Sequence, residues 1–340
     1  MIIAKTPYRV SFFGGGSDYP DWYKKNGGTV ISASINKHVY ITCRSLPSYF
    51  KHRYRVSYSK IEEAKKIKDI KHKVVRTILK KYKDKIKNSG LEIHYDGDFP
   101  SRSGVGSSSS FVVGLLHALN EFYNLKLNKK KLANLSIELE QKNLKETVGI
   151  QDPVAAAYGG FNEIKFFKSG KYKVNSLVKD EKELKVLQDR LFLVFTGVRK
   201  KSKTANDIAG SYVKNLSITK INEIQSIIRH AKEAKKFLKN KDYDSFGKLL
   251  GETWKKKKQI SKNISNPKID KIYKLGIKNG ALGGKLLGAG GAGFLLFYVP
   301  EKKNKSFIKK FKNYTIVKFK FDKKGSEIIF NNKEKDEKFF

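Results

Sequence analysis

The alternation of apolar and polar residues predicts a chain that mixes strands with helices. Period-two alternation, with β-branched and aromatic side chains, predicts strands at residues 2–13, 29–46 (as a strand pair), 91–95, 161–167, 191–195 and 294–299. Apolar residues at helical spacing predict helices over residues 60–87, 111–122, 128–144 and 218–260, with Asn128 as the N-cap of the third. We therefore expect an α+β fold.

The strand-and-helix pattern restarts near Leu191, which divides the chain into two parts. A single hydrophobic core usually stops growing before a chain reaches 340 residues. We predict an N-terminal domain over residues 1–185 and a C-terminal domain over residues 186–340.

Composition excludes wholesale disorder and gives no sign of a membrane protein. Hydrophobic residues make up 39% of the chain, and no apolar run approaches the length of a membrane span. The N-terminus passes directly into a strand-like segment, so we expect no signal peptide. The lone cysteine, Cys43, permits no intramolecular disulfide and is expected to be a small buried hydrophobe. A reducing cytoplasm is the expected location.

The formal net charge of +40 decides little by itself. The 72 Lys and Arg residues outnumber 32 Asp and Glu, but the lysines are scattered through helix-like and loop segments. Proteins that bind nucleic acid usually concentrate such charge and interleave aromatic residues with it. A basic field favours anionic ligands in general. We expect no specific nucleic-acid partner, with non-enzymatic nucleic-acid binding as the remote alternative.

The strongest chemical signal is a glycine- and serine-rich loop between a predicted strand and an apolar helix. It runs Gly104-Val105-Gly106-Ser107-Ser108-Ser109-Ser110. Glycines let the backbone approach a ligand closely, and free N–H groups at a helix start attract phosphate. Serine hydroxyls can also ligate magnesium. The lysine of a Walker-type P-loop is absent, so we predict a different phosphate-binding loop.

A second glycine-rich segment, Gly288-Ala289-Gly290-Gly291-Ala292-Gly293, satisfies the Gly-x-Gly-x-x-Gly pattern. It leads into a strand, whereas a dinucleotide-binding fingerprint follows a strand and begins a helix. We predict a tight turn that approaches a ligand rather than a dinucleotide site.

Three segments in this order resemble the motifs of the GHMP kinases, the family of galactokinase, homoserine kinase, mevalonate kinase and phosphomevalonate kinase. They are Pro7-Tyr8-Arg9 with Gly14-Gly15-Gly16-Ser17-Asp18, the loop at 104–110, and Lys285 to Gly293. The first motif is most similar to the branch of the D-glycero-D-manno-heptose 7-phosphate kinases and fucokinases. In the middle loop, Val105 and Ser109 replace the family's usual Leu and Ala, which are small chemical changes.

The resemblance implies a two-domain fold, with an N-terminal domain like domain 2 of ribosomal protein S5 and a ferredoxin-like C-terminal domain. It also implies ATP as the phosphate donor and Mg²⁺ as cofactor. The residues that would bind ATP are Ser103, Gly104, Val105, Gly106, Ser107, Ser108 and Ser109.

The resemblance further implies roles for three charged residues. Glu140, with Ser107 or Ser108, would ligate magnesium, which needs few protein oxygens. Asp152 would accept the proton of the substrate hydroxyl, and Arg9 would keep that carboxylate ionised and orient it. The alternative for Asp152 is a helix N-cap.

The predicted substrate-binding residues are Ser17, Asp18, Arg199, Gly290 and Gly291. Asp18 resembles the carboxylate that receives sugar hydroxyls in the sugar kinases, with a helix cap as the equal alternative. Arg199 is the best candidate in the cationic loop 196–203, which either holds a substrate phosphate or is merely solvated.

The expected acceptor is the anomeric hydroxyl of D-glycero-D-manno-heptose 7-phosphate. An unphosphorylated sugar, fucose or galactose, is the next alternative, followed by mevalonate or homoserine. The resemblance leaves this choice open.

Overall fold

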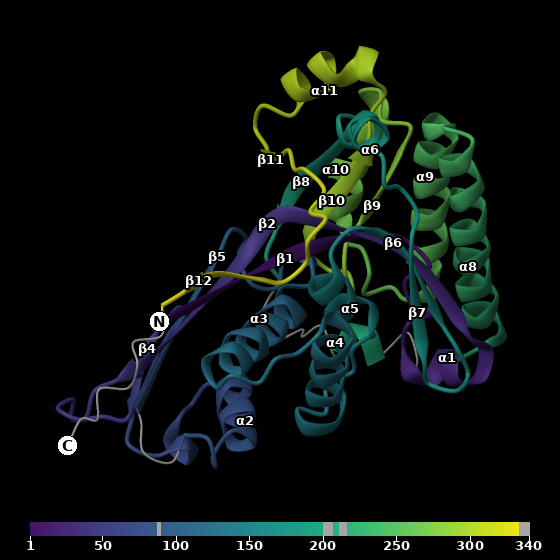
Figure 1. Cartoon of the computed structure of the whole chain (residues 1–340). Helices are drawn as coiled ribbons and strands as arrows, with labels where there is room; N and C mark the ends of the chain where they lie inside the picture. Colours follow the sequence, from purple (N-terminus) through teal and green to yellow (C-terminus); the bar gives the residue numbers. More distant parts are fainter. Residues whose placement is uncertain (87–89, 200–206, 211–215, 333–340) are drawn as a thin grey trace.

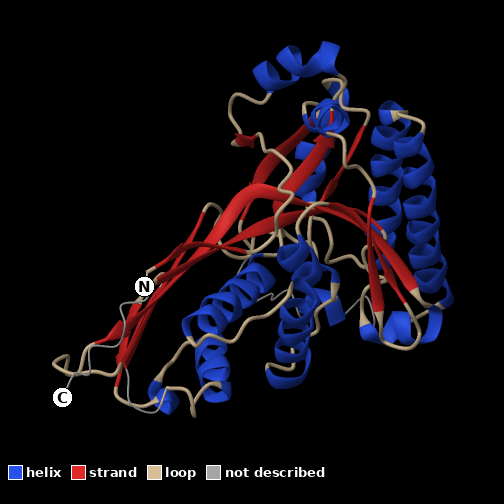
Figure 2. Cartoon of the chain, in the orientation of Figure 1, coloured by secondary structure: helices blue, strands red, loops and turns tan. Residues whose placement is uncertain are grey.

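The computed structural model describes residues 1–86, 90–199, 207–210 and 216–332, which form two β-sheets with helices packed against them (Figures 1 and 2). The strands are β1 (Ile2–Phe13), β2 (Gly28–Leu46), β3 (Tyr54–Ser57), β4 (Ile61–Ala64), β5 (Gly90–Gly97), β6 (Phe161–Phe166), β7 (Tyr172–Ser176), β8 (Leu191–Gly197), β9 (Gly283–Leu286), β10 (Gly293–Tyr298), β11 (Ile316–Val317) and β12 (Glu327–Asn331). The helices are α1 (Pro20–Asn26), α2 (Lys73–Lys81), α3 (Ser107–Phe122), α4 (Lys129–Glu138), α5 (Gln151–Tyr158), α6 (Glu181–Gln188), α8 (Ile218–Lys239), α9 (Tyr243–Ile260), α10 (Pro267–Lys278) and α11 (Asn304–Lys310). The predicted α+β fold is confirmed.

The first sheet has the order β12-β1-β2-β5-β3-β4, and β6 joins it through β2 and carries β7. β2 is one long strand rather than the predicted pair, because it serves two neighbours in succession. Its first part, residues 28–33, pairs with β6, and its last part, residues 39–46, pairs with β5. A register shift against β1, between the pairs Pro7–His38 and Tyr8–Ile35, lies between these two parts.

Helices α2 to α5 lie along one face of the first sheet (Figures 1 and 2). α3 is the central one, and its side chains Leu115 and Leu119 are fully buried, which stabilises the packing by about 1.5–3 kcal/mol each. Gly114 lets α3 approach the sheet closely, because a Cβ there would lie 2.9 Å from Oγ1 of Thr6. Nearer the start of α3, the Ser110 hydroxyl donates to the Pro7 carbonyl of β1 at 2.9 Å, which holds this end of the helix against the strand.

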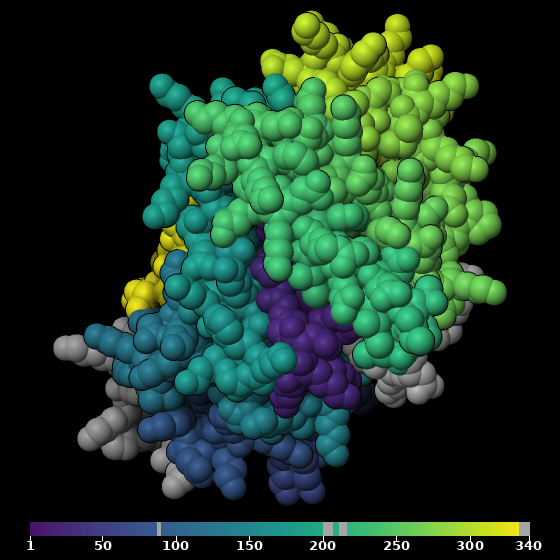
Figure 3. Space-filling model, turned by 90° about the vertical axis from the view of Figure 1, so that its right-hand side faces the viewer, coloured from purple at the N-terminus to yellow at the C-terminus, as the bar shows by residue number. Residues whose placement is uncertain are grey.

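The second sheet has the order β11-β8-β10-β9 and is antiparallel throughout. The predicted helices over residues 218–260 are present as α8 and α9, which lie side by side and form the green upper part of the face seen in Figure 3. Trp254 of α9 and Phe297 of β10 belong to the fully buried core between this sheet and its helices.

The helix predicted over residues 60–87 is wrong in its first part. Residues 61–64 form β4, which pairs with β3 in a hairpin that joins Tyr54 to Ala64. The stretch is rich in lysine and glutamate and has too few apolar residues to cover a helical face, so Lys73–Lys81 is the α-helical part of the described residues 60–86.

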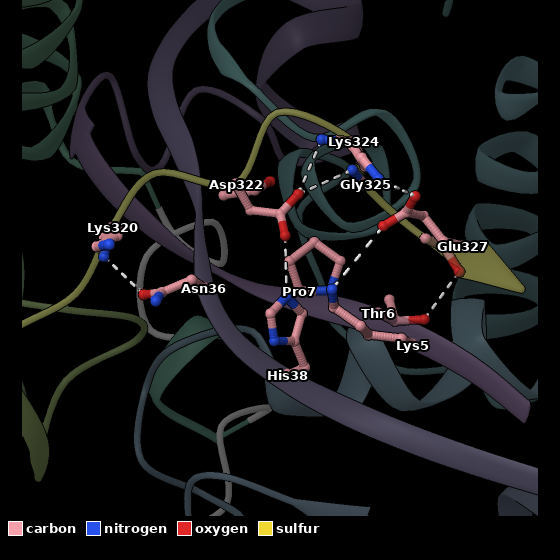
Figure 4. Close-up of polar contacts among 12 residues, drawn as sticks. Lys5, Thr6, Pro7, Asn36, His38, Lys320, Asp322, Lys324, Gly325 and Glu327 are labelled. Carbon is pink, nitrogen blue, oxygen red and sulfur yellow. Dashed lines mark hydrogen bonds and ion pairs between the residues drawn. The ribbon is translucent and has the colours of Figure 1, made fainter. Parts of the chain in front are cut away.

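The last described segment returns to the first sheet (Figure 4). The Asp322 carboxylate lies 2.9 Å from Nε2 of His38 on β2, and the backbone N–H of Lys320 donates to the Asn36 side chain. β12 then pairs with β1. The last described strand, β12, is therefore part of the same sheet as β1. The predicted division between residues 185 and 186 stays a prediction.

None of the helices in the described ranges combines the length and the apolar character needed to span a bilayer. Cys43 is fully buried on β2, as expected.

Candidate active site

A cavity of about 1130 Å³ lies where elements of both halves of the chain meet. The first half contributes the end of β5, the start of α3, the start of α5 and the segment that precedes α1. The second half contributes residues of α8 and α9, and the turn between β9 and β10. Most of the residues that the sequence analysis singled out lie on or directly behind its wall.

The predicted phosphate loop forms one side of this cavity. Gly104 and Gly106 have φ values of 82° and 78°, which glycine adopts without steric cost. Gly106 is the N-cap of α3, and the first backbone bond within the helix is donated by Ser110 to the Gly106 carbonyl, at 2.9 Å. The N–H groups of residues 107–109 therefore lie ahead of that bond, as in a phosphate-binding helix start.

Two of the predicted ATP-binding residues are buried and do not lie on the cavity wall. Ser103 and Val105 are fully buried, and neither lines the cavity. The Val105 carbonyl accepts a bond from the Arg9 N–H at 3.0 Å, which ties the loop to β1. Ser103 and Val105 therefore help to hold the loop in place and do not face the cavity.

Arg9 and Asp152 form a bidentate ion pair on the cavity wall. The Arg9 Nε and Nη2 atoms each donate to one oxygen of Asp152, both at 2.7 Å. Arg9 also donates from Nη1 to the Gly104 carbonyl at 2.8 Å, so one guanidinium fixes both the carboxylate and the loop. Asp152 is the second residue of α5 and its N-cap is Ile150, so the alternative that Asp152 is the N-cap is wrong.

Glu140 is fully buried in a π-helical turn, η2 (Leu139–Asn143), that follows α4. Neither carboxylate oxygen has a hydrogen bond of good geometry within the described chain. Burial raises the pKa of Glu140 to about 8, Asp152 adds to this rise, and the nearby Ser109 hydroxyl opposes it. Glu140 is therefore a buried carboxylate that lacks a hydrogen-bond partner of good geometry in the described chain. A cation bound beside the phosphate loop would compensate its charge.

Asp18 lies on the cavity wall and Ser17 does not. The Asp18 carboxylate accepts bonds from the Gly16 N–H at 3.0 Å and the Gln151 amide at 2.9 Å. Burial, and then the Asp152 charge, raise the pKa of Asp18. It is not a helix cap, because the N-cap of α1 is Tyr19. The Ser17 hydroxyl instead donates to the Gly14 carbonyl at 2.7 Å and holds the turn before α1.

The turn between β9 and β10 packs directly on the phosphate loop. A Cβ on Gly104 would lie 2.7 Å from the Leu287 carbonyl oxygen. Gly290 and Gly291 lie beyond the cavity wall, where the Gly290 carbonyl accepts a bond of 3.1 Å from Nε of Arg199.

Arg199 is buried and lines the cavity. Residues 200–203 of the predicted cationic loop lie outside the described residues. Of that loop, the structure therefore places the arginine at the site and says nothing of the lysines.

Comparisons with known proteins agree with this geometry. The family models for the N-terminal and the C-terminal domain of GHMP kinases match residues 71–160 and 234–313. The chain is 31% identical to the D-glycero-alpha-D-manno-heptose 7-phosphate kinase of Campylobacter jejuni, over 95% of this chain and 97% of that protein. The chain belongs to the GHMP kinases.

Two further similarities bear on this GHMP kinase. The crystal structure of a D-glycero-D-manno-heptose 1-phosphate kinase from Bacteroides thetaiotaomicron superposes with a TM-score of 0.80 and 25% identity, covering 98% of this chain and all of that one. The mevalonate kinase of Methanocaldococcus jannaschii is 34% identical over 65% of each chain. The prediction of an ATP-dependent phosphotransferase of the sugar-kinase type, with an alcohol group as acceptor, is confirmed.

The sequence analysis missed two buried lysines of this kinase. Lys257 on α9 and Lys285 on β9 both line the cavity. Lys257 stands in a run of four of the lysines that the sequence shows scattered through helix-like and loop segments, and Lys285 is predicted only as part of the third motif. Trp254 is fully buried and stands three residues before Lys257, so both lie on the same side of α9. This spacing could have indicated from the sequence that Lys257 faces the interior.

It also missed an aromatic end of the cavity, on the side of α2 and β5. Tyr58 meets His72 edge-on at a centroid distance of 4.8 Å, and His72 and Tyr95 lie 5.3 and 5.4 Å from Phe111. These residues come from four separate segments, so no local pattern predicted their meeting.

The contact between the phosphate loop and the turn gives a prediction. We expect Gly104→Ala to raise the KM for ATP about tenfold, because the new methyl group would push the loop away from the Leu287 carbonyl. Gly170→Ala is the matched control, since Gly170 also has a positive φ of 83° but nothing within 4 Å of its Cβ position. Both variants should lose about 1–3 kcal/mol of stability from backbone strain. Equal KM values in steady-state kinetics would contradict the loop contact.

Proposed function

We propose that this kinase transfers the γ-phosphate of ATP to the anomeric hydroxyl of D-glycero-D-manno-heptose 7-phosphate. The observation that carries the chemistry is the Arg9–Asp152 pair, which presents an oriented carboxylate to the cavity next to the phosphate loop. The similarity to a heptose 7-phosphate kinase over nearly the whole of both chains supports the choice of acceptor.

Asp152 acts as the general base of a direct transfer in this proposal. The acceptor oxygen attacks the γ-phosphorus, the bond from that phosphorus to the β–γ bridging oxygen breaks, and ADP leaves. The proton of the acceptor hydroxyl passes to the Asp152 carboxylate, and Arg9 holds that carboxylate in place through both of its oxygens. Asp18, on the same wall, receives sugar hydroxyls.

ATP would occupy the cavity from the aromatic end to the start of α3. Its phosphates meet the N–H groups and hydroxyls of Ser107, Ser108 and Ser109, all on the cavity wall. Its base packs among the aromatic rings around Phe111.

The loop and Glu140 fit a magnesium ion. Glu140 offers a buried carboxylate without a hydrogen-bond partner in the described chain, and the loop offers serine hydroxyls, both of which are oxygen ligands suited to Mg²⁺. We propose Glu140 with Ser107 or Ser108 as the residues that hold it. When bound with ATP, the ion would neutralise charge on the β- and γ-phosphates.

An acceptor screen tests the proposal. Purified protein is incubated with Mg²⁺, ATP and each of five acceptors: heptose 7-phosphate, the unphosphorylated heptose, fucose, galactose and mevalonate. We expect kcat/KM for heptose 7-phosphate to exceed that for each of the others by at least about tenfold, equivalent to 1.4 kcal/mol. A higher kcat/KM for an unphosphorylated sugar would show that the protein is a kinase of free sugars. A higher kcat/KM for mevalonate would overturn the assignment of a sugar as the acceptor.

The cytoplasmic location and the lack of a specific nucleic-acid partner stay predictions. A gel shift with random DNA at two salt concentrations tests the second, because phosphate-driven binding weakens steeply as salt rises.

A further inference from the structure

Arg102 stands two residues before the first glycine of the phosphate loop, in a backbone conformation that arginine seldom adopts. Its φ is 64°, in the left-handed region, where the Cβ atom of an L-residue crowds the backbone. Residues in such a conformation persist only where their surroundings hold them, and they cluster at ligand sites. The strained backbone at Arg102 is therefore typical of a functional position.

The residues that follow Arg102 are held on two sides. Ser103 is fully buried, and a Cβ on Gly293 of β10 would clash with the Ser103 carbonyl group. The Gly104 carbonyl accepts the bond of 2.8 Å from Nη1 of Arg9. Arg102 itself is exposed and lines the cavity. The contacts with β10 and with Arg9 thus fix the backbone directly after Arg102, while its side chain stays on the cavity wall.

The Arg102 side chain differs from the other cations of the cavity because it has no partner. Five lysine and arginine side chains of the described ranges line the cavity, namely Arg9, Arg102, Arg199, Lys257 and Lys285. Arg9 forms the ion pair with Asp152, and the three cations of the second half donate to backbone carbonyl groups. Arg102 makes no hydrogen bond, ion pair or ring contact with any described residue. Its guanidinium, which stays charged at any ordinary pH, therefore has all five N–H donors available for a ligand.

The phosphate loop itself carries no positively charged side chain. Residues 103–110 are all glycine, valine or serine, so they offer a phosphate only backbone N–H groups and hydroxyls. A Walker-type loop adds a lysine to such donors, and that lysine is absent here. A triphosphate carries more negative charge than one divalent cation neutralises, and phosphoryl transfer depends on compensating this charge. Arg102 directly precedes the loop and lines the same cavity as Gly104 and Ser107.

We propose that Arg102 binds the phosphates of ATP and supplies the positive charge that a lysine supplies in a Walker-type loop. This assignment rests on the ATP-dependent function proposed above and adds a binding residue to it. A planar guanidinium can donate to two phosphate oxygens at once, which suits a ligand with several such oxygens. The cost of the left-handed backbone at Arg102 is then offset when the nucleotide binds.

Substitutions that remove or keep the charge test this contact by kinetics. We expect Arg102→Met to raise the KM for ATP by about 10- to 100-fold, the usual loss for one charged hydrogen bond. Arg102→Lys keeps the charge, and its KM for ATP should rise less. The KM for the acceptor should stay within about twofold in both variants. Lys241→Met is the matched control and should leave both KM values unchanged, since Lys241 is also an exposed cation with a positive φ, 57°, but does not line the cavity.

Thermal melts of Arg102→Gly separate binding from a structural role. Glycine relieves the backbone strain and removes the guanidinium, so the Tm of the free protein should not fall. A non-hydrolysable ATP analogue with Mg²⁺ should raise the Tm of Arg102→Gly less than that of the unsubstituted protein or of Lys241→Gly. This measurement uses no acceptor. If heptose 7-phosphate proves not to be a substrate and this pattern holds, the proposed acceptor is wrong and the Arg102 contact stands.

Three results would overturn the contact. The first is a KM for ATP and a nucleotide-induced Tm shift that the Arg102 substitutions leave unchanged. The second is a lower Tm of free Arg102→Gly with a full nucleotide-induced shift, which would show that Arg102 only supports the fold. The third is a loss of kcat/KM confined to heptose 7-phosphate, with unphosphorylated heptose and ATP unaffected, which would assign Arg102 to a phosphate on the acceptor.

Discussion

Asp152→Asn should lower kcat by about 10²–10⁴-fold, the usual contribution of a general base. The amide keeps the size of the carboxylate but cannot accept the proton of the acceptor hydroxyl. It also loses one of the two bonds that Arg9 makes at 2.7 Å, because an amide nitrogen is a donor. The KM for ATP should change little, since Asp152 does not belong to the phosphate loop.

Steady-state kinetics with the true acceptor measure this effect. Asp21→Asn is the matched control, because Asp21 also lies in the first turn of a helix, α1, but is exposed. It should change stability by no more than about 1 kcal/mol through the helix dipole and leave kcat unchanged. If Asp152→Asn keeps full turnover, Asp152 is not the base.

Glu140→Gln should raise the Mg²⁺ concentration needed for half-maximal activity by at least about tenfold, because it removes the only charged ligand proposed for the ion. The same change should stabilise the protein when no metal is present. The pKa of Glu140, about 8 in the folded chain, lies above the ordinary 4.5, so the folded state binds the proton more tightly than the unfolded state. The unsubstituted protein therefore loses stability as pH rises from about 4.5 to about 8, and the variant avoids that loss.

Thermal melts in EDTA at pH 5 and pH 8 test the stability part without any activity measurement. We expect the Tm of Glu140→Gln to exceed that of the unsubstituted protein at pH 8 and to approach it at pH 5. Adding Mg²⁺ with a non-hydrolysable ATP analogue should raise the Tm of the unsubstituted protein more than that of the variant. Identical metal dependence of both proteins would show that Glu140 is not a ligand.

Much of the part of the site proposed to bind phosphate could be predicted from the sequence, because its residues are local. The glycines of the loop at 104–110, the helix that follows and the N-cap Asn128 all leave short-range signatures, and the structure has them in place. Asp152 and Arg9 required the family resemblance, because residues 143 positions apart meet only through the packing of α5 on the first sheet.

The two buried lysines of the cavity could not be predicted in the same way. Lys257 and Lys285 have nothing in their immediate sequence that separates them from the many solvated lysines of the chain. Their burial depends on α9 packing against β9, which is a tertiary contact. Likewise, the helix predicted over residues 60–87 is wrong in its first part, because residues 61–64 pair with β3 as a strand and their helical pattern is weak.

The position of the transferred phosphate tests the central claim most directly. The product formed from heptose 7-phosphate, Mg²⁺ and ATP can be followed by phosphorus NMR with coupling to the sugar protons. We predict one new phosphate resonance coupled to the anomeric proton, the original 7-phosphate retained, and one ADP formed per product. A new phosphate on another hydroxyl, or ADP formed without any phosphorylated product, would contradict the account.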